Sequence, residues 1–288
     1  EFALWCFSRD YLDWQSLSAA AFCKHQRVLE AYVAKGGFLH EGFALLAAQA
    51  GHVDILRWLR SQTPPCLWTT STCCEAAYYG HLDCLQFLRE QDPPCPWNER
   101  TLFEARRKGH VNCLRYALEN GCPMPEISIT FKIMYGNVDT VRCMHEKGYR
   151  LYKQTARTAA AKGDLETIRY FHEHEALVEN DICLLAAHNG CLNILRFLHE
   201  NGYSLHDKTC TVAARGGSLL CLRYAHENGY PWCVWTCANA ARNGHLECLK
   251  YAREQDPPCP WDDKTYRLAE EHSRPECLQY AREHGCPG

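Results

Sequence analysis

Ten copies of one short pattern run along the 288-residue chain and constrain its fold more than any other feature. Each copy reads as a bulky apolar residue, a small pair such as Ala-Ala, a Gly-His dipeptide and a Leu-rich segment, as in WTTSTCCEAAYYGHLDCLQFLREQ from Trp68. Successive copies are 27 or 29 residues apart, and each 29-residue spacing carries a Thr-Pro-Pro or Asp-Pro-Pro insertion. The central glycine, or the residue that replaces it, is Lys24, Gly51, Gly80, Gly109, Gly136, Gly163, Gly190, Gly217, Gly244 and Ser273. Such a fixed period is typical of repeat arrays.

Each copy predicts a pair of short antiparallel helices. The first helix starts after a capping residue such as Asn98 or Asp262 and ends near the glycine, because glycine readily adopts the left-handed conformation that stops a helix. The second helix, from about Leu246 to Glu254 in the ninth copy, stops at a Gly or a Pro-Pro. Neither helix can bury its apolar face alone, so the pairs must stack. We therefore expect an all-α solenoid of stacked helix-turn-helix repeats.

The repeats extend along the whole chain, so we expect a single domain over residues 1–288. Residues 1–11 align with the second helix of a partial repeat, ten repeats fill residues 12–285, and residues 286–288 begin a further repeat. No apolar run reaches the roughly 18 residues that a membrane helix needs, which predicts that the array does not associate with a membrane. The sequence contains no Asn-X-Ser/Thr acceptor, which favours an intracellular protein, cytoplasmic or nuclear.

The repeat resembles the ankyrin repeat. The stretch AA-x-x-GH-x-(D/E)-x-L in Ala47–Leu56, Ala76–Leu85 and Ala240–Leu249 is similar to the core of the ankyrin consensus. Two departures are the missing Thr-Pro-Leu-His opening and a period shorter than the ankyrin length of about 33 residues. The missing residues fall in the loop that forms a β-hairpin finger in ankyrin proteins. The resemblance therefore implies ankyrin-like helix pairs with short loops in place of fingers.

In the ankyrin family the pair of residues before the glycine faces the concave surface and binds partner proteins. Here this pair varies between copies while the framework repeats. The resemblance thus implies protein–protein interaction, with Tyr, Arg and Met side chains that interfaces favour, and a partner with an acidic or aromatic segment. Similar arrays are often joined to an F-box or related adaptor, which implies substrate recognition. The candidate partner-binding residues are Tyr78, Tyr79, Arg106, Arg107, Lys108, Met134, Tyr135, Lys162, Arg215 and Arg242.

Two other functions stay open at this point. Nucleic acid could bind the basic residues of the same surface, with a strong dependence on salt. We expect a nucleic-acid partner to be unlikely, because 31 Lys and Arg against 34 Asp and Glu leave a formal charge of −3. The other alternative is a metal- or redox-responsive array, since the chain has 20 cysteines.

Most cysteines occupy three repeating positions at which Val, Ile, Thr, Leu, Ala or Tyr stands in other copies. These positions therefore favour a small buried group rather than a thiolate. Equivalent residues of stacked helices lie roughly 8–10 Å apart, which is too far for a disulfide. No C-x-x-C occurs, and the neighbouring His172 and His174 lack partners at zinc-finger spacing. We expect reduced structural thiols and no metal site.

The second helices carry a basic row with acids three residues before or four residues after it, as Arg169 has Glu166 and Glu173. Such pairs predict a solvated, self-neutralised outer face. Four histidines of the second helices lie at scattered positions, and we expect their side chains to be solvated: His145, His172, His199 and His226.

The sequence lacks the common catalytic and nucleotide-binding motifs, among them G-x-x-x-x-G-K-[ST], G-x-G-x-x-G, H-E-x-x-H and G-x-S-x-G. Most polar residues belong to repeating positions, whereas a catalytic site is singular. We therefore expect no enzyme, no cofactor and no small-molecule substrate.

Overall fold

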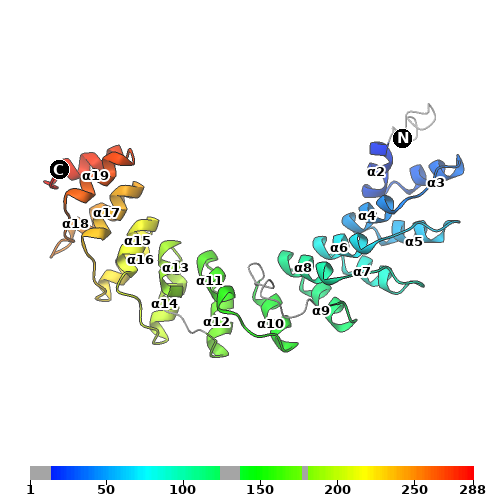
Figure 1. Cartoon of the computed structure of the whole chain (residues 1–288), viewed down its shortest axis with the longest axis horizontal. Helices are drawn as coiled ribbons and strands as arrows, with labels where there is room; N and C mark the ends of the chain where they lie inside the picture. The colour runs from blue at the N-terminus through cyan, green and yellow to red at the C-terminus, as the bar shows by residue number, and fades with distance from the viewer. Residues whose placement is uncertain (1–13, 124–136, 177–180) are drawn as a thin grey trace. The chain divides into compact units, whose positions relative to one another are not determined.

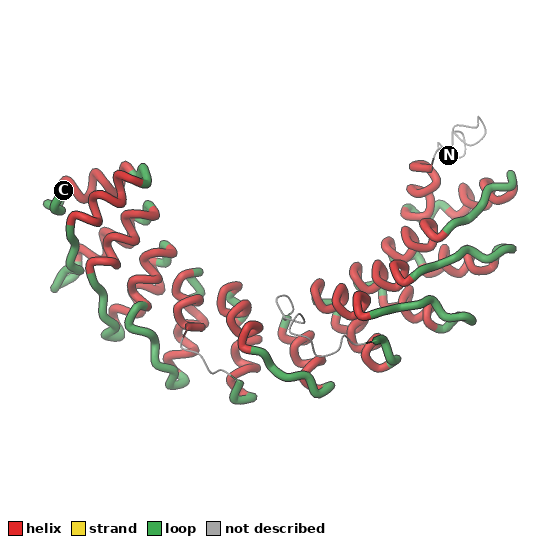
Figure 2. Tube along the Cα trace, in the orientation of Figure 1, coloured by secondary structure: helices red, strands yellow, loops and turns green. Residues whose placement is uncertain are grey.

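The computed structural model describes residues 14–123, 137–176 and 181–288, and this part consists of helices and loops without strands (Figures 1 and 2). The helices group into two compact units, unit 1 (Glu1–Tyr149) and unit 2 (Arg150–Gly288). The all-α repeat fold is confirmed, whereas a single domain over the whole chain stays a prediction. The helix predicted over residues 1–11 lies outside the described residues.

Unit 1 is built from stacked helix pairs. The first helices of the pairs form one row, which we call the first row: α2 (Trp14–Phe22), α4 (Glu41–Ala50), α6 (Thr70–Tyr79) and α8 (Glu99–Lys108). The second helices form the second row: α3 (Gln26–Ala34), α5 (Val53–Ser61), α7 (Leu82–Arg89), α9 (Val111–Glu119) and α10 (Val138–Glu146). Helices of one pair lie against each other, and successive helices of a row lie side by side (Figure 2).

Unit 2 repeats this arrangement with five pairs. Its first row consists of α11 (Lys153–Lys162), α13 (Asp181–His188), α15 (Thr209–Gly216), α17 (Val234–Asn243) and α19 (Asp263–Glu271). Its second row consists of α12 (Leu165–Glu173), α14 (Leu192–Glu200), α16 (Leu219–Glu227), α18 (Leu246–Glu254) and α20 (Pro275–Glu283).

The predicted helix ends agree with the structure. The side chain of Asn98 accepts a hydrogen bond from the backbone N–H of Arg100 at 3.1 Å, and Asp262 accepts one from Lys264 at 3.2 Å. Such caps satisfy backbone donors that the first turn leaves unpaired. The predicted second helix of the ninth copy matches α18 residue for residue.

The repeated Gly-His dipeptide packs one repeat on the next. Gly80 follows α6 with a φ of +80°, and a Cβ placed on it would lie 2.5 Å from Nδ1 of His110 in the next repeat. The imidazole of His81 lies in turn 3.1 Å, through Nε2, from the carbonyl oxygen of Gln49 in the preceding repeat. Glycine at position 80 therefore suits the left-handed turn and leaves the room that the His110 ring occupies.

Small residues let the first-row helices approach closely. The alanine pairs Ala47 and Ala48, and Ala76 and Ala77, have no exposed surface. They lie where α4 packs against α6 and α6 against α8. The second row supplies the larger apolar side chains of the core, such as Leu85 and Ile168, which are also fully buried.

The second row keeps the predicted exposed ion pairs, such as Arg169 with Glu166 and Lys250 with Glu247, but its side chains also make contacts between repeats that were not expected. Its arginines lie over aromatic rings of the next repeat, for example with Cζ of Arg223 5.4 Å from the Tyr251 ring centroid. Three histidines hydrogen-bond to tyrosine hydroxyls of the next repeat, at 2.9 Å for His172 with Tyr203 and 3.3 Å for His226 with Tyr251. Burial also lowers the pKa of His226. The prediction that these histidines are solvated is wrong for His172, His199 and His226, because each ring fills the space between stacked helix pairs.

The described cysteines are free, and most are buried. Those in the loop after a second helix donate their S–H to the backbone carbonyl of the residue that precedes the first helix of the same pair, as Cys95 does to Thr69 at 3.3 Å and Cys122 to Asn98 at 3.2 Å. Burial raises the pKa of the Cys84 thiol to about 12 and that of Cys66 to about 11. These thiols are structural hydrogen-bond donors and apolar fillers.

We expect a thiol reagent to modify few cysteines of the native protein. Among the described ones, Cys23 and Cys233 are exposed and should react first, because buried thiols with a raised pKa hold almost no thiolate at neutral pH. The buried thiols should react only after denaturation. Rapid modification of most thiols in the folded protein, counted by mass spectrometry, would contradict this assignment.

Candidate functional site

Two tyrosines and two cations meet where α6 and α8 end in unit 1. Tyr78 and Tyr79 are the last residues of α6, and Arg107 and Lys108 are the last residues of α8. The two tyrosine rings lie 4.7 Å apart at an angle of 64°. Tyr79 is 42% exposed, and its hydroxyl accepts a hydrogen bond from Nε2 of Gln49, at 2.8 Å, in the preceding repeat. An aromatic ring thus stands at the surface, held at its hydroxyl end.

Both cations approach the Tyr78 ring. Nζ of Lys108 lies 4.4 Å and Cζ of Arg107 5.0 Å from the ring centroid, within the range of cation–π attraction. Contact with Lys108, and to a smaller extent with Arg107, lowers the pKa of Tyr78. We call these four residues the Tyr–cation cluster: Tyr78, Tyr79, Arg107 and Lys108.

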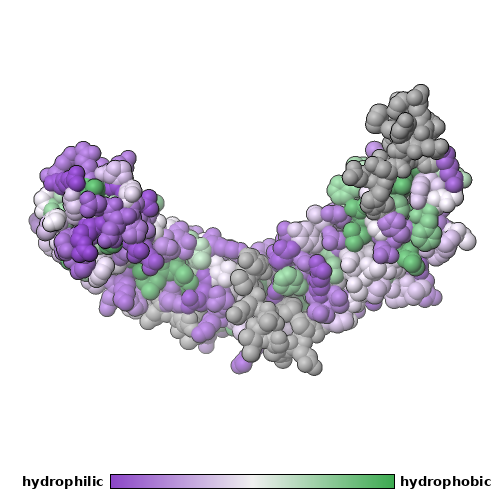
Figure 3. Space-filling model, turned by 45° about the horizontal axis from the view of Figure 1, so that its top comes forward, coloured by the Kyte–Doolittle hydropathy of each residue, from purple (hydrophilic) through white to green (hydrophobic). Residues whose placement is uncertain are grey.

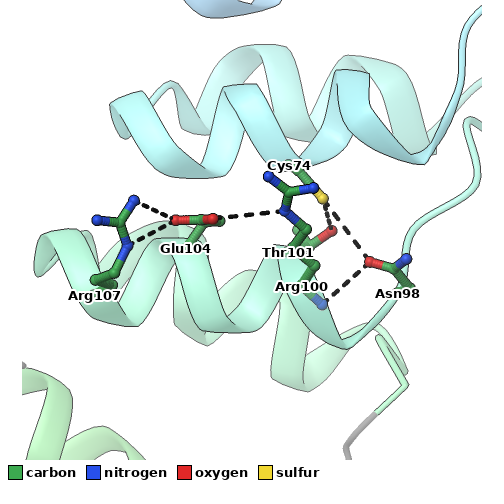
Figure 4. A network of polar contacts seen from close by, with 6 residues as sticks. All are labelled: Cys74, Asn98, Arg100, Thr101, Glu104 and Arg107. Atoms are coloured by element: carbon green, nitrogen blue, oxygen red, sulfur yellow. Dashed lines mark hydrogen bonds and ion pairs between the residues drawn. The ribbon is translucent and has the colours of Figure 1, made fainter. Parts of the chain in front are cut away.

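An acid balances the charge of Arg107 but not that of Lys108. Glu104 accepts hydrogen bonds from Nε and Nη2 of Arg107 at 2.9 and 2.8 Å, and it lies 3.6 Å from Arg100 (Figure 4). No carboxylate lies within 4 Å of the Lys108 ammonium among the residues that the structure describes. The cluster therefore presents a net positive charge beside exposed aromatic surface.

Arg106 does not belong to this surface. Its side chain is only 2% exposed, and burial lowers the pKa of its guanidinium to about 10. Successive helical residues point about 100° apart, so the position before Arg107 turns into the helix packing, with Cζ 5.5 Å from the Phe103 ring centroid. The prediction that Arg106 binds a partner at the surface is wrong. Met134 and Tyr135 lie outside the described residues.

In unit 2 the predicted residues Lys162, Arg215 and Arg242 are exposed at or next to the last residues of α11, α15 and α17. Two imidazoles lie nearby: His188, the last residue of α13, and His272, whose Nε2 lies 3.2 Å from Nε of Arg242. On the face that Figure 3 shows, hydrophilic residues dominate the C-terminal end of unit 2, whereas hydrophobic patches alternate with polar residues over the N-terminal helices of unit 1.

A close backbone approach fixes the helix ends in unit 2. A Cβ on Gly216, the last residue of α15, would lie 1.9 Å from the carbonyl oxygen of His188 at the end of α13. Ser218 also donates a hydrogen bond to this oxygen, at 3.3 Å. Glycine at position 216 thus lets the C-terminal ends of α13 and α15 touch. His188 therefore lies beside Gly216, the direct neighbour of Arg215 in the sequence.

The described part of the chain contains no group of three His, Cys, Asp or Glu residues that could hold a metal ion. None of its described helices is both long and apolar enough to cross a membrane.

Comparison with known proteins finds no matching family model and no matching curated protein. Solved structures do match. Two are crystal structures of the pentatricopeptide repeat protein PPR10 in complex with an 18-nt psaJ RNA element, one of a cysteine-to-serine variant. Each aligns with a TM-score of 0.44 and 12% identity, over 96% of this chain and 49% of the other. PPR10 from maize aligns with a TM-score of 0.31 and 17% identity, over 99% and 46%. The chain thus spans about half the length of these proteins.

The predicted membership in the ankyrin repeat family is wrong, because no family model matches the chain and the matching structures above are pentatricopeptide repeat proteins. The buried alanine pairs and the contact between Gly80 and His110 show the physical reason. Close stacking of helix pairs favours small residues and a left-handed turn at this spacing. The motif therefore indicates stacking geometry rather than a particular family.

Two functional predictions rested on the ankyrin resemblance and are wrong together with it. One is the binding of a protein partner with an acidic or aromatic segment, and the other is substrate recognition for an adaptor. The expectation that a nucleic-acid partner is unlikely is also contradicted, since two of the matching structures hold RNA.

Proposed function

We propose that the chain binds single-stranded nucleic acid at the first-row helix ends of unit 1, as a binding protein without catalytic activity. The observation that carries this proposal is the Tyr–cation cluster, in which an exposed tyrosine stands beside cations that an acid only partly balances.

The chemistry of the cluster fits an unpaired strand. The exposed ring of Tyr79 offers a flat surface for a base, and base–aromatic stacking is largely independent of sequence. Bases in a duplex already stack on one another, so they cannot use this ring. Lys108 can neutralise a phosphate next to a base on Tyr79, since its ammonium has no carboxylate within 4 Å among the described residues. The formal charge of −3 does not oppose this, because a ligand responds to the local field.

Fluorescence anisotropy with labelled oligonucleotides tests the proposal on the full chain. We expect a single-stranded RNA or DNA to bind and a duplex of the same sequence to bind more weakly. Binding should weaken as salt rises from about 50 to about 200 mM, because phosphate contacts release counterions. The RNA and DNA arms show whether the ribose hydroxyl contributes.

Replacing Lys108 by alanine provides the local check. The substitution should remove about one phosphate contact. The slope of log K against log salt should therefore become shallower by about 0.7 for a single strand. The matched control is Arg57→Ala, which removes one exposed charge from the second row of the same unit. Absence of binding at about 50 mM salt, or a preference for the duplex, would refute the proposed function.

A further inference from the structure

The two rows of unit 2 differ in charge. Over the four helices α11, α13, α15 and α17, the first row carries five Lys or Arg side chains and one carboxylate. The neighbouring second-row helices α12, α14, α16 and α18 carry five Lys or Arg side chains and six carboxylates. Stacking alone does not require this asymmetry in charge, because it depends on the apolar faces that both rows bury.

The single carboxylate of these first-row helices is already engaged. It belongs to Asp181, which forms an ion pair with Arg157. α15 and α17 contain no acidic residue, and both carry an exposed arginine next to their last residue, Arg215 and Arg242. Among the described residues, neither arginine has a carboxylate within ion-pair distance. On the second row, by contrast, Arg169 lies 3.8 Å from Glu166 and Lys250 3.3 Å from Glu247.

The geometry of the helix ends keeps these charges together. The close approach at Gly216 places the end of α15 against that of α13, so His188 and Arg215 come from adjacent helices in contact. α15 packs in turn against α17, which brings Arg242 into the same row. The excess of positive charge on the first row ends at α19. This helix carries two cations and three acids, and its cations pair with Asp262 and Asp263.

We propose that the first-row helices α11 to α17 of unit 2 form a contact surface of their own for single-stranded nucleic acid, which binds its phosphates rather than its bases. This inference rests on the proposed function of unit 1. The two surfaces differ in composition: an exposed aromatic ring stands beside the cations at the end of α6, whereas the ends of α15 and α17 offer guanidinium groups. Guanidinium groups bind phosphate oxygens through two parallel hydrogen bonds.

The test is the salt dependence of single-stranded RNA binding by the full chain with the double substitution Arg215→Ala and Arg242→Ala. The slope of log K against log salt should fall by about 1.4, which is about 0.7 for each phosphate that the variant no longer neutralises. The matched control is Arg196→Ala with Arg223→Ala, which removes the same charge from the second row of the same unit. The control should leave the slope unchanged.

A second readout separates this role from a purely structural one. Cations near helix C-termini also stabilise the helix macrodipole, so melting temperatures of both double variants are measured. A variant that is less stable but has an unchanged slope would overturn the inference, as would equal slopes for the first-row and second-row variants. If the unsubstituted chain binds no single strand, the proposed function fails and this inference with it. If the unsubstituted chain binds a single strand but the Arg215→Ala, Arg242→Ala variant has an unchanged slope, this inference fails and the proposed function does not.

Discussion

Alanine at position 216 is expected to lower the free energy of unfolding of unit 2 by about 3 kcal/mol. The added Cβ would lie 1.9 Å from the carbonyl oxygen of His188 and 2.7 Å from its carbonyl carbon. Backbone atoms cannot rotate away as the end of a flexible side chain can, so α15 must shift from α13. Because Gly216 ends α15, the gain in helix propensity, about 1 kcal/mol in a helix interior, cannot offset this clash.

The control for this prediction is Gly202→Ala. Gly202 has a φ of +81° and no atom within 4 Å of an added Cβ, so alanine there meets only the cost of the left-handed conformation, about 1 kcal/mol. Urea unfolding followed by circular dichroism gives both values, and hydrogen exchange should locate the loss of stability at α13 and α15. A Gly216→Ala protein no less stable than Gly202→Ala would show that the close approach is not a feature of the folded protein.

The second large effect concerns binding. Replacing Tyr78 and Tyr79 together by alanine should weaken single-stranded RNA binding by about 10- to 100-fold, since one stacked base contributes about 1–3 kcal/mol. The slope of log K against log salt should hardly change, because no cation is removed. This combination of weaker affinity and unchanged slope is opposite to the result expected for the arginines of unit 2.

The matched control is Tyr152→Ala. Tyr152 is 44% exposed in unit 2, about as much as Tyr79, but it precedes α11 and so lies at the start of a first-row helix rather than at its C-terminal end. Circular dichroism must show that all variants fold. Equal binding by the parent and the Tyr78→Ala, Tyr79→Ala protein would remove the tyrosines from the site.

Much of the fold could be predicted from the sequence, because each signal is local. The cap at Asn98, the glycine stop after α6 and the span of α18 depend on residues within one or two helical turns. Repetition strengthens such signals, since a position that accepts Cys, Val, Ile and Thr must be small and buried. The same repetition misled the family assignment, because stacking imposes similar spacings on any array of tight helix pairs.

The parts that could not be predicted depend on contacts between repeats. Arg106 and Arg107 are neighbours in sequence, yet one is buried and the other lies over Tyr78. The hydrogen bond from Gln49 to Tyr79 spans 30 residues, so no pattern within one repeat indicates it. Gly216 could not be singled out either, because its role depends on the backbone of α13.

Photo-crosslinking locates a bound strand on the helix rows. A single-stranded RNA containing 4-thiouridine is bound to the full chain and irradiated, and the modified peptides are identified by mass spectrometry. We expect crosslinks in the peptide that contains Tyr78 and Tyr79, with further ones at the ends of first-row helices. Crosslinks confined to second-row helices, such as α7 around Phe87, would place the strand on the other side of the helix pairs and contradict the account.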